Sequence, residues 1–244
     1  MSDPRPERLA VLIDADNISP KLADELFEEL TKIGDAMVRR IYGDFSTPNL
    51  GGWTNVMPKH AINAHQNFAN IVGKNATDIA LVIDAMDLLH SGRFDAFCLV
   101  SSDSDFTRLA SRIREHGLRV YGFGERKSAE SYRNACHRFI YLDNISSAID
   151  EDQTEPSDPT KAPQPPSKAR PLIAKAIRQL DPEGGWVSLS GVGSRMQELV
   201  TDFDYRTYGY PNLSRLVEKA GSFEIERRDN AGTWVRIKPK GTSA

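Results

Sequence analysis

The 244-residue chain has only two cysteines, Cys98 and Cys136, and this small number does not suggest a disulfide framework or a zinc site. Cys98 lies in an apolar run, where it can pack as a small hydrophobic residue. The chain also lacks an apolar run of about 18 residues, the length of a membrane-spanning helix. Its first residues, MSDPRPER, contain no apolar signal core. From these absences we expect a cytoplasmic protein with no membrane partner.

Several nucleotide-binding signatures are missing as well. No Gly-x-x-x-x-Gly-Lys-Ser/Thr loop occurs, which argues against a nucleoside triphosphatase. The dinucleotide fingerprint is incomplete, because Gly122-Phe-Gly124 is not followed by the third glycine. A receiver-like phosphotransfer domain needs a lysine at the end of a late strand, and the same Gly-Phe-Gly occupies that place. The net charge of −3 argues neither for nor against a polyanionic substrate.

Acidic residues stand where apolar runs stop, and this is the main positive signal. The run 9–13 is followed by Asp14 and Asp16, and the run 96–100 is followed by Asp103 and Asp105. In a parallel sheet the carboxyl ends of the strands meet at one edge, where ligands bind. Carboxylates gathered there cannot all stay ionised without compensation. The pattern therefore predicts a site for Mg²⁺ or Mn²⁺, which can acidify bound water and polarise a phosphoryl oxygen.

Each acid also has a simpler structural interpretation. Asp78 follows Thr77 and can be a first-turn acid that the helix dipole favours. Asp105 can cap the helix that follows it, and Asn17 is a common turn residue. Asp84 lies six residues after Asp78 inside the same predicted helix, so we expect it to be structural. Two separate apolar runs that both end in Asp-x-Asp are more specific than any one of these acids.

The order of predicted elements indicates two domains. Residues 151–168 are rich in proline and contain no large apolar residue, which is typical of a semi-rigid linker between a domain at 1–150 and one at 169–244. In the first domain, strands alternate with helices, which predicts an α/β fold with a parallel sheet. The expected strands are 8–14, 36–43, 96–101, 118–123 and 138–142, and the expected helices are 19–33, 56–67, 76–90, 104–116 and 128–136.

The second domain has a different outline. Helices are expected at 170–180, 190–201 and 212–220, with a short strand at 186–189. The segments 223–228 and 233–238 flank a turn and predict a terminal hairpin. Three helices with such a hairpin predict a smaller, winged-helix-like α+β domain.

Three sequence blocks of the first domain, at 11–17, 74–78 and 100–106, resemble the signature blocks of the NYN domain, in the same order. NYN domains belong to the PIN-like ribonuclease superfamily, and the LabA-like subgroup is the most similar one. The resemblance implies a doubly wound parallel sheet of order 3-2-1-4-5. It implies catalytic, metal-binding acids at Asp14, Asp78, Asp103 and Asp105. Expected substrate contacts are Asn17 beside the first acid, Lys74, Ser102, and Trp53, which would stack on a base or else close over the core.

The segment 170–238 resembles the OST-HTH/LOTUS domain through Trp186-Val-Ser-Leu and the motif 208–216. That family is associated with RNA binding, although some relatives bind proteins instead. Aromatic rings for stacking and cations for phosphate suit RNA. The implied RNA-facing residues are Arg206, Tyr208, Tyr210, Arg215 and Lys219, and the alternative for both tyrosines is packing in a small core.

Together these features favour a metal-dependent ribonuclease that uses Mg²⁺ or Mn²⁺ and binds RNA through its second domain. The alternative is a non-catalytic RNA-binding regulator that keeps the acidic fold. The sequence leaves open the RNA target, endonucleolytic or exonucleolytic cleavage, the number of metals, a homodimer, and a protein partner of the second domain.

Overall fold

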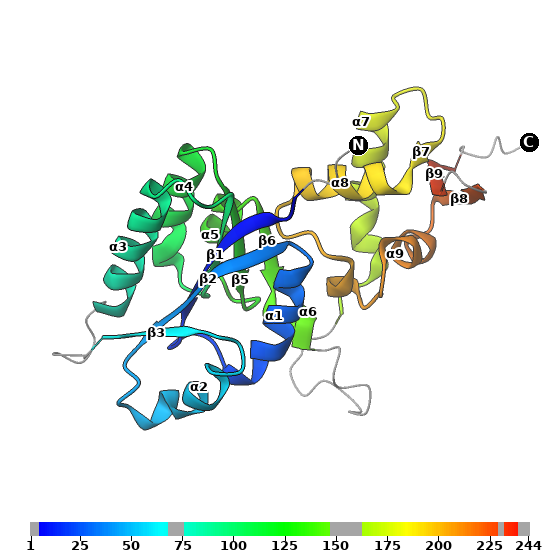
Figure 1. Cartoon of the computed structure of the whole chain (residues 1–244). Helices are drawn as coiled ribbons and strands as arrows, with labels where there is room; N and C mark the ends of the chain where they lie inside the picture. The colour runs from blue at the N-terminus through cyan, green and yellow to red at the C-terminus, as the bar shows by residue number, and fades with distance from the viewer. Residues whose placement is uncertain (1–4, 68–75, 147–162, 229–231, 239–244) are drawn as a thin grey trace, which may run out of the picture. The chain divides into compact units, whose positions relative to one another are not determined.

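The chain divides into two units, Met1–Glu151 and Asp152–Ala244, and each is described by itself. The computed structural model describes residues 5–67, 76–146, 163–228 and 232–238 (Figure 1). Most of the predicted linker at 151–168 lies outside these ranges. Its last part, from residue 163, is folded into the second unit. The Gln164 N–H donates to the Thr207 carbonyl at 3.0 Å, and a short 3₁₀ helix, η4, spans Pro166–Ala169.

The first unit is built on a parallel sheet in the order β3-β2-β1-β4-β5-β6. The predicted order 3-2-1-4-5 is confirmed, and one further strand extends it. The central strand β1 pairs with β2 on one side and with β4 on the other, where Ile13 aligns with Val100. The strands are β1 Glu7–Asp14, β2 Gly34–Gly43, β3 Asn63–Gln66, β4 Ala96–Val100, β5 Arg119–Gly124 and β6 Arg138–Tyr141.

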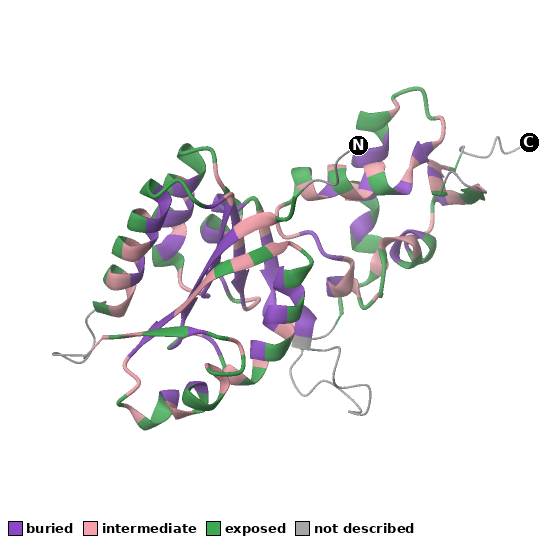
Figure 2. Cartoon of the chain, viewed as in Figure 1, coloured by how far each residue is buried: buried purple, intermediate pink, exposed green. Residues whose placement is uncertain are grey.

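Helices cover both faces of this sheet, so its central strands are the most buried part of the unit (Figure 2). Leu9 and Val11 of β1 pack with α1 and α6, whereas Ala10 and Leu12 pack with α3, α4 and α5. A strand buried on both faces must be apolar throughout, which explains its unbroken apolar sequence. The helices are α1 Ala23–Thr31, α2 Gly51–Val56, α3 Ala76–His90, α4 Thr107–Glu115, α5 Glu130–Ala135 and α6 Leu142–Ser146.

The helix predicted at 56–67 is wrong. Helix α2 ends at Val56, and residues 63–66 form the edge strand β3 beside β2. Pro58 explains the early end, because proline lacks the N–H that would continue the helix. The other helices expected in this unit are present, although 3₁₀ turns form the first residues of the helices predicted at 19–33 and 104–116.

The second unit has a small helical core beside a three-stranded sheet of order β7-β9-β8. Its outline of helices and a terminal hairpin agrees with the winged-helix-like prediction, and the turn residues 229–231 lie outside the described ranges. No helix among the described residues of either unit is long and apolar enough to cross a membrane. The elements are α7 Arg170–Leu180, β7 Val187–Ser188, α8 Leu189–Leu199, α9 Leu213–Ala220, β8 Phe223–Arg228 and β9 Gly232–Ile237.

Candidate functional site

The first acid of the site, Asp14, is the last residue of β1 and is almost fully buried, with 1% of its surface exposed. One carboxylate oxygen, Oδ2, accepts hydrogen bonds from Asn17 Nδ2 at 2.6 Å and from Ser101 Oγ at 2.8 Å. The other oxygen accepts from the Asp16 backbone N–H at 3.2 Å. Burial raises the pKa of Asp14, and the bonds from Ser101 and Asn17 oppose that rise. The site therefore starts from a buried carboxylate that neighbouring donors hold in one orientation.

Ser101 joins the two strand ends that carry acids. It directly follows β4, which lies beside β1, and its side chain is buried. Its hydroxyl donates to Asp14 and accepts from the Asp103 backbone N–H at 3.1 Å. No motif in the sequence assigned Ser101 a role of its own. The available signal was its position, since the residue after β4 must lie beside the last residue of β1 if these strands are neighbours.

Asp103 and Asp105 form a tight turn after β4. Asp103 is extended, with φ −78° and ψ 134°, and its carboxylate accepts from the Asp105 backbone N–H at 2.9 Å. Asp103 is thereby the N-cap of the 3₁₀ helix η3, Ser104–Phe106, that leads into α4. The capping role that we considered for Asp105 belongs to Asp103, because the extended backbone of the cap occurs two residues earlier. The Asp105 side chain is exposed.

Asp78 brings a second part of the chain to the same place. It lies in the first turn of α3 and is half-buried. Burial raises its pKa to about 6, and neighbouring negative charges act in the same direction. Those charges belong to Asp14, Asp103, Asp105 and Asp16, from the largest effect to the smallest. The acids from the ends of β1 and β4 and from α3 thus share one electrostatic environment.

The donor chemistry of this environment fits a hard divalent cation, because all of the charged groups named above are carboxylates. The arrangement is not a closed cage. Within the described ranges, no three side chains of the His, Cys, Asp and Glu types converge closely enough to hold an ion. An ion bound here would take few direct protein ligands, as Mg²⁺ commonly does when it keeps several waters and binds substrate phosphates.

The other predicted contacts in this unit have mixed outcomes. Asn17 is directed onto Asp14, as expected for a polar partner of the first acid. The Ser102 hydroxyl is directed into the fold instead, where it accepts from the Glu125 backbone N–H at 2.9 Å and ties the end of β4 to the end of β5. Lys74 lies outside the described residues. Asp84 is structural, as expected, since it pairs with Arg40 and accepts from the Tyr42 hydroxyl.

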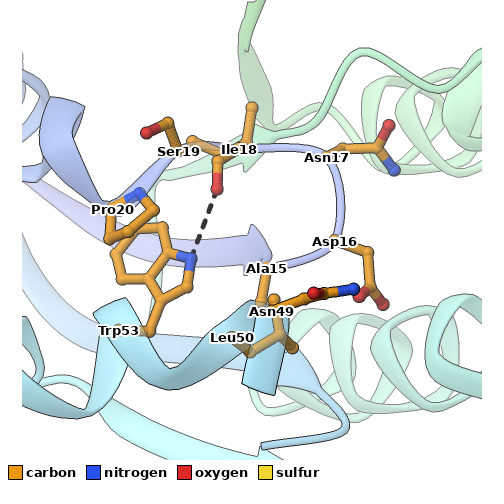
Figure 3. Close-up of a pocket in the computed structure, with 9 residues that line it drawn as sticks. All are labelled: Ala15, Asp16, Asn17, Ile18, Ser19, Pro20, Asn49, Leu50 and Trp53. Atoms are coloured by element: carbon orange, nitrogen blue, oxygen red, sulfur yellow. Dashed lines mark hydrogen bonds between the residues drawn. The ribbon is translucent and has the colours of Figure 1, made fainter. Parts of the chain in front are cut away.

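Trp53 is not available for stacking on a base. Its side chain is fully buried, and the indole Nε1 donates to the Ile18 carbonyl at 3.2 Å (Figure 3). Burying a large apolar ring in the core stabilises the folded protein more than leaving it on the surface, which explains its inward position. The alternative that Trp53 closes over the local core is the correct one.

The RNA-facing residues expected in the second unit fall into two groups. Arg206 is held by buried Asp204, with Nη2 and Oδ2 2.7 Å apart, and Tyr208 and Tyr210 pack partly against the core of this unit. Arg215 and Lys219 are exposed on α9, where Arg215 also pairs with Glu218 at 3.0 Å. Helix α9 therefore presents the more accessible cations of the predicted set.

Comparisons with known proteins agree with this geometry. The NYN domain family matches residues 8–143, and the OST-HTH/LOTUS domain matches residues 161–235. A search of curated proteins gave no significant match.

Among solved structures, a protein of unknown function from Vibrio parahaemolyticus is 17% identical. The similarity covers 59% of this chain and 98% of that one with a TM-score of 0.50, and at this identity it shows the fold alone. An uncharacterised protein from Nitrosomonas europaea is 28% identical over 39% of this chain and 97% of its own, with a TM-score of 0.27. The NYN match spans more than half of the chain, and the sheet order and strand-end acids accompany it. The chain belongs to the NYN domain family of PIN-like nuclease folds, and it carries an OST-HTH/LOTUS domain, an RNA-binding module, after the NYN domain.

Proposed function

We propose that this protein is a ribonuclease that depends on Mg²⁺ or Mn²⁺ and hydrolyses phosphodiester bonds of RNA. The observation that carries the proposal is the gathering of carboxylates from β1, β4 and α3 at one place, where burial and, after it, the neighbouring negative charges raise the pKa of Asp78 to about 6. A carboxylate that is harder to ionise because of other carboxylates gains from a bound cation. The membership in a nuclease superfamily and the adjoining RNA-binding module make RNA the expected substrate.

In this proposal, Asp14, Asp78, Asp103 and Asp105 hold the metal. A bound divalent ion supplies positive charge that stabilises the phosphoryl oxygens and acidifies water. The residues around the acids keep them in place. Asn17 and Ser101 orient the Asp14 carboxylate and keep it closer to its ionised form, while the turn at Asp103 fixes the loop after β4.

The second unit supplies RNA binding in this scheme. Arg215 and Lys219 on α9 are exposed and can contact phosphates. Tyr208 and Tyr210 are only partly buried, so each ring keeps some surface for a base. The metal site and the RNA contacts would then lie on separate folding units of one chain.

A single-turnover cleavage assay tests the proposal. Fluorescent single-stranded RNA is incubated with the purified full chain and Mg²⁺ or Mn²⁺, beside the variant Asp103→Asn. We expect metal-dependent cleavage by the wild type and a loss of at least about 100-fold in the variant. Equal cleavage by both proteins would show that a contaminating nuclease is responsible and would remove the support for an enzyme.

The second candidate is an RNA-binding regulator that does not cleave. It is favoured by the lack, within the described residues, of three side chains already close enough to hold an ion. It predicts saturable RNA binding by the wild type and by Asp103→Asn, with intact RNA in both cases. The same assay with an added binding measurement separates the two candidates, and a chain that neither binds nor cleaves RNA excludes both.

A further inference from the structure

A pocket with a volume of about 310 Å³ opens beside the acidic edge of the sheet (Figure 3). It lies between the loop that follows β1 and the segment formed by the 3₁₀ helix η2, Pro48–Leu50, and α2. Its size is near the lower end of the range for pockets that hold small ligands. Because Asp16 and Asn17 line it and Asp14 ends the adjoining strand, a group bound in the pocket would be a close neighbour of the acids.

The walls of the pocket differ in chemistry. In Figure 3, the polar ends of Asp16 and Asn49 lie on the same side, whereas Pro20 and Trp53 lie on the other. Leu50, which is almost fully buried, adds a small apolar surface. None of the nine described residues that line the pocket is a lysine, arginine or histidine. A phosphate would meet a carboxylate without a compensating cation, so the pocket suits a flat, uncharged group with hydrogen-bond donors on its edge.

The pocket is held in shape before any ligand binds. The indole N–H of Trp53 donates to the Ile18 carbonyl, which fixes α2 against the loop after β1. The two segments also approach closely at Gly52, where an added Cβ would lie 2.8 Å from Pro20 Cγ. A rigid site loses less conformational entropy on binding than a flexible one. The walls therefore favour one ligand shape over others.

We propose that this pocket binds a guanine base of the RNA strand that lies over the acids. The inference rests on the proposed function. An ionised carboxylate only accepts hydrogen bonds. Guanine presents two adjacent donors, N1–H and the 2-amino group, whereas the amino groups of adenine and cytosine each stand beside a ring acceptor. The two oxygens of Asp16 match these two guanine donors. The Asn49 amide offers a donor and an acceptor for the other polar atoms of the guanine edge. Leu50 and Pro20 contact the ring.

The test compares two labelled oligouridines, one with a single central guanosine and one with adenosine at that position. Their affinities for the full chain are measured by fluorescence anisotropy in Ca²⁺, with gels to check that the RNA stays intact. We expect the guanosine strand to bind about tenfold more tightly. The preference should fall to less than about threefold in Asp16→Asn and Asn49→Ala. The matched control is Asn55→Ala, an exposed asparagine on α2 outside the pocket, which should keep the full preference.

The outcomes are separable. RNA binding with equal affinity for both strands overturns the guanine pocket and leaves the proposed function in place. A preference that survives in Asp16→Asn and Asn49→Ala shows that another surface reads the base and also overturns it. If free GMP competes with RNA binding in a way that depends on Asn49, but neither strand is preferred, the pocket binds a free nucleotide. That result overturns the proposal that it binds a guanine of the RNA strand. A failure to bind or cleave either strand counts against the proposed function itself.

Discussion

Acidic residues have opposite surroundings at the two ends of the strands of the parallel sheet. At one end they pair with arginines, and at the other they lie among other acids. At the edge where β1 and β4 begin, Asp95 accepts from Arg8 Nε at 2.9 Å and from the Arg8 backbone N–H at 3.0 Å. Glu7 pairs there with Arg119 at the start of β5. At the edge where β1 and β4 end, Asp78 lies among other carboxylates, whose charges help to raise its pKa.

The acids at the two ends differ in whether folding favours their ionised form. The hydrogen bonds from Arg8 lower the pKa of Asp95, so its ionised form is favoured by folding. Burial and like charges raise the pKa of Asp78, so its ionised form is disfavoured. An edge that maintains such repulsion is expected to gain a cation in its working state.

The largest difference is expected in catalysis. Asp14→Asn should lower RNA cleavage at saturating Mg²⁺ by at least about 100-fold, because it removes a charge that holds the metal. Asp95→Asn, the same chemical change at the opposite edge, should leave the rate unchanged. Rates are measured under single-turnover conditions with circular dichroism to confirm folding. Equal losses in two folded variants would contradict the distinction between the edges.

The second prediction concerns binding of the cation without catalysis. Mg²⁺ at about 100 times its dissociation constant should raise the free energy of unfolding by about 2.7 kcal/mol. Thermal unfolding is followed across a MgCl₂ series, with NaCl of equal ionic strength as the reference. The increase should persist in Asp95→Asn and disappear in the double variant Asp14→Asn/Asp78→Asn. An undiminished increase in the double variant would place the cation elsewhere.

The third prediction uses the raised pKa of Asp78. Without divalent ions at pH 7, Asp78→Asn should stabilise the protein by about 1–2 kcal/mol, after allowance for solvent screening. Because the pKa is about 6 in the folded chain and ordinarily 3.8, the protonated carboxyl stabilises the fold at low pH. That contribution is lost as the pH rises through about 6. Urea unfolding from pH 4 to 7 should show this loss in the wild type and a smaller one in the variant. An identical dependence of the free energy of unfolding on pH in both proteins would contradict the raised pKa of Asp78.

The smallest effect, on the free energy of unfolding, is expected for Asp95 at the edge where β1 and β4 begin. Asp95→Asn should slightly destabilise the protein at pH 7, because the lowered pKa of Asp95 means that its carboxylate stabilises the fold when ionised. The difference between variant and wild type should shrink on acidification below the ordinary aspartate pKa, because Asp95 then binds a proton in the unfolded chain before it does so in the folded one. It should also shrink at high salt, which screens the pair with Arg8. Urea unfolding at pH 7 and pH 3 measures it. A stabilising substitution would mean that Asp95 is repelled rather than paired.

Much of the fold could be predicted because its determinants are local. The apolar run of β1 and its final acid are adjacent in sequence, and the resemblance to NYN domains supplied the strand order. The short segment after α2 was misread as helix, since its pairing with β2 depends on a distant strand. The roles of Ser101 and Trp53 were missed or left open for the same reason, because each is defined by a partner far away in the chain.

By itself, the sequence determined that acids follow two apolar strands and that an α/β unit precedes a smaller helical one. Local patterns carry this information, because strand alternation and turn residues act over a few positions. Only the tertiary structure decided that Asp78 is influenced by Asp14 and Asp103, and that Asp16 and Asn49 line one pocket. Electrostatic effects and pocket walls depend on distance in space, and folding brings together residues that are far apart along the chain.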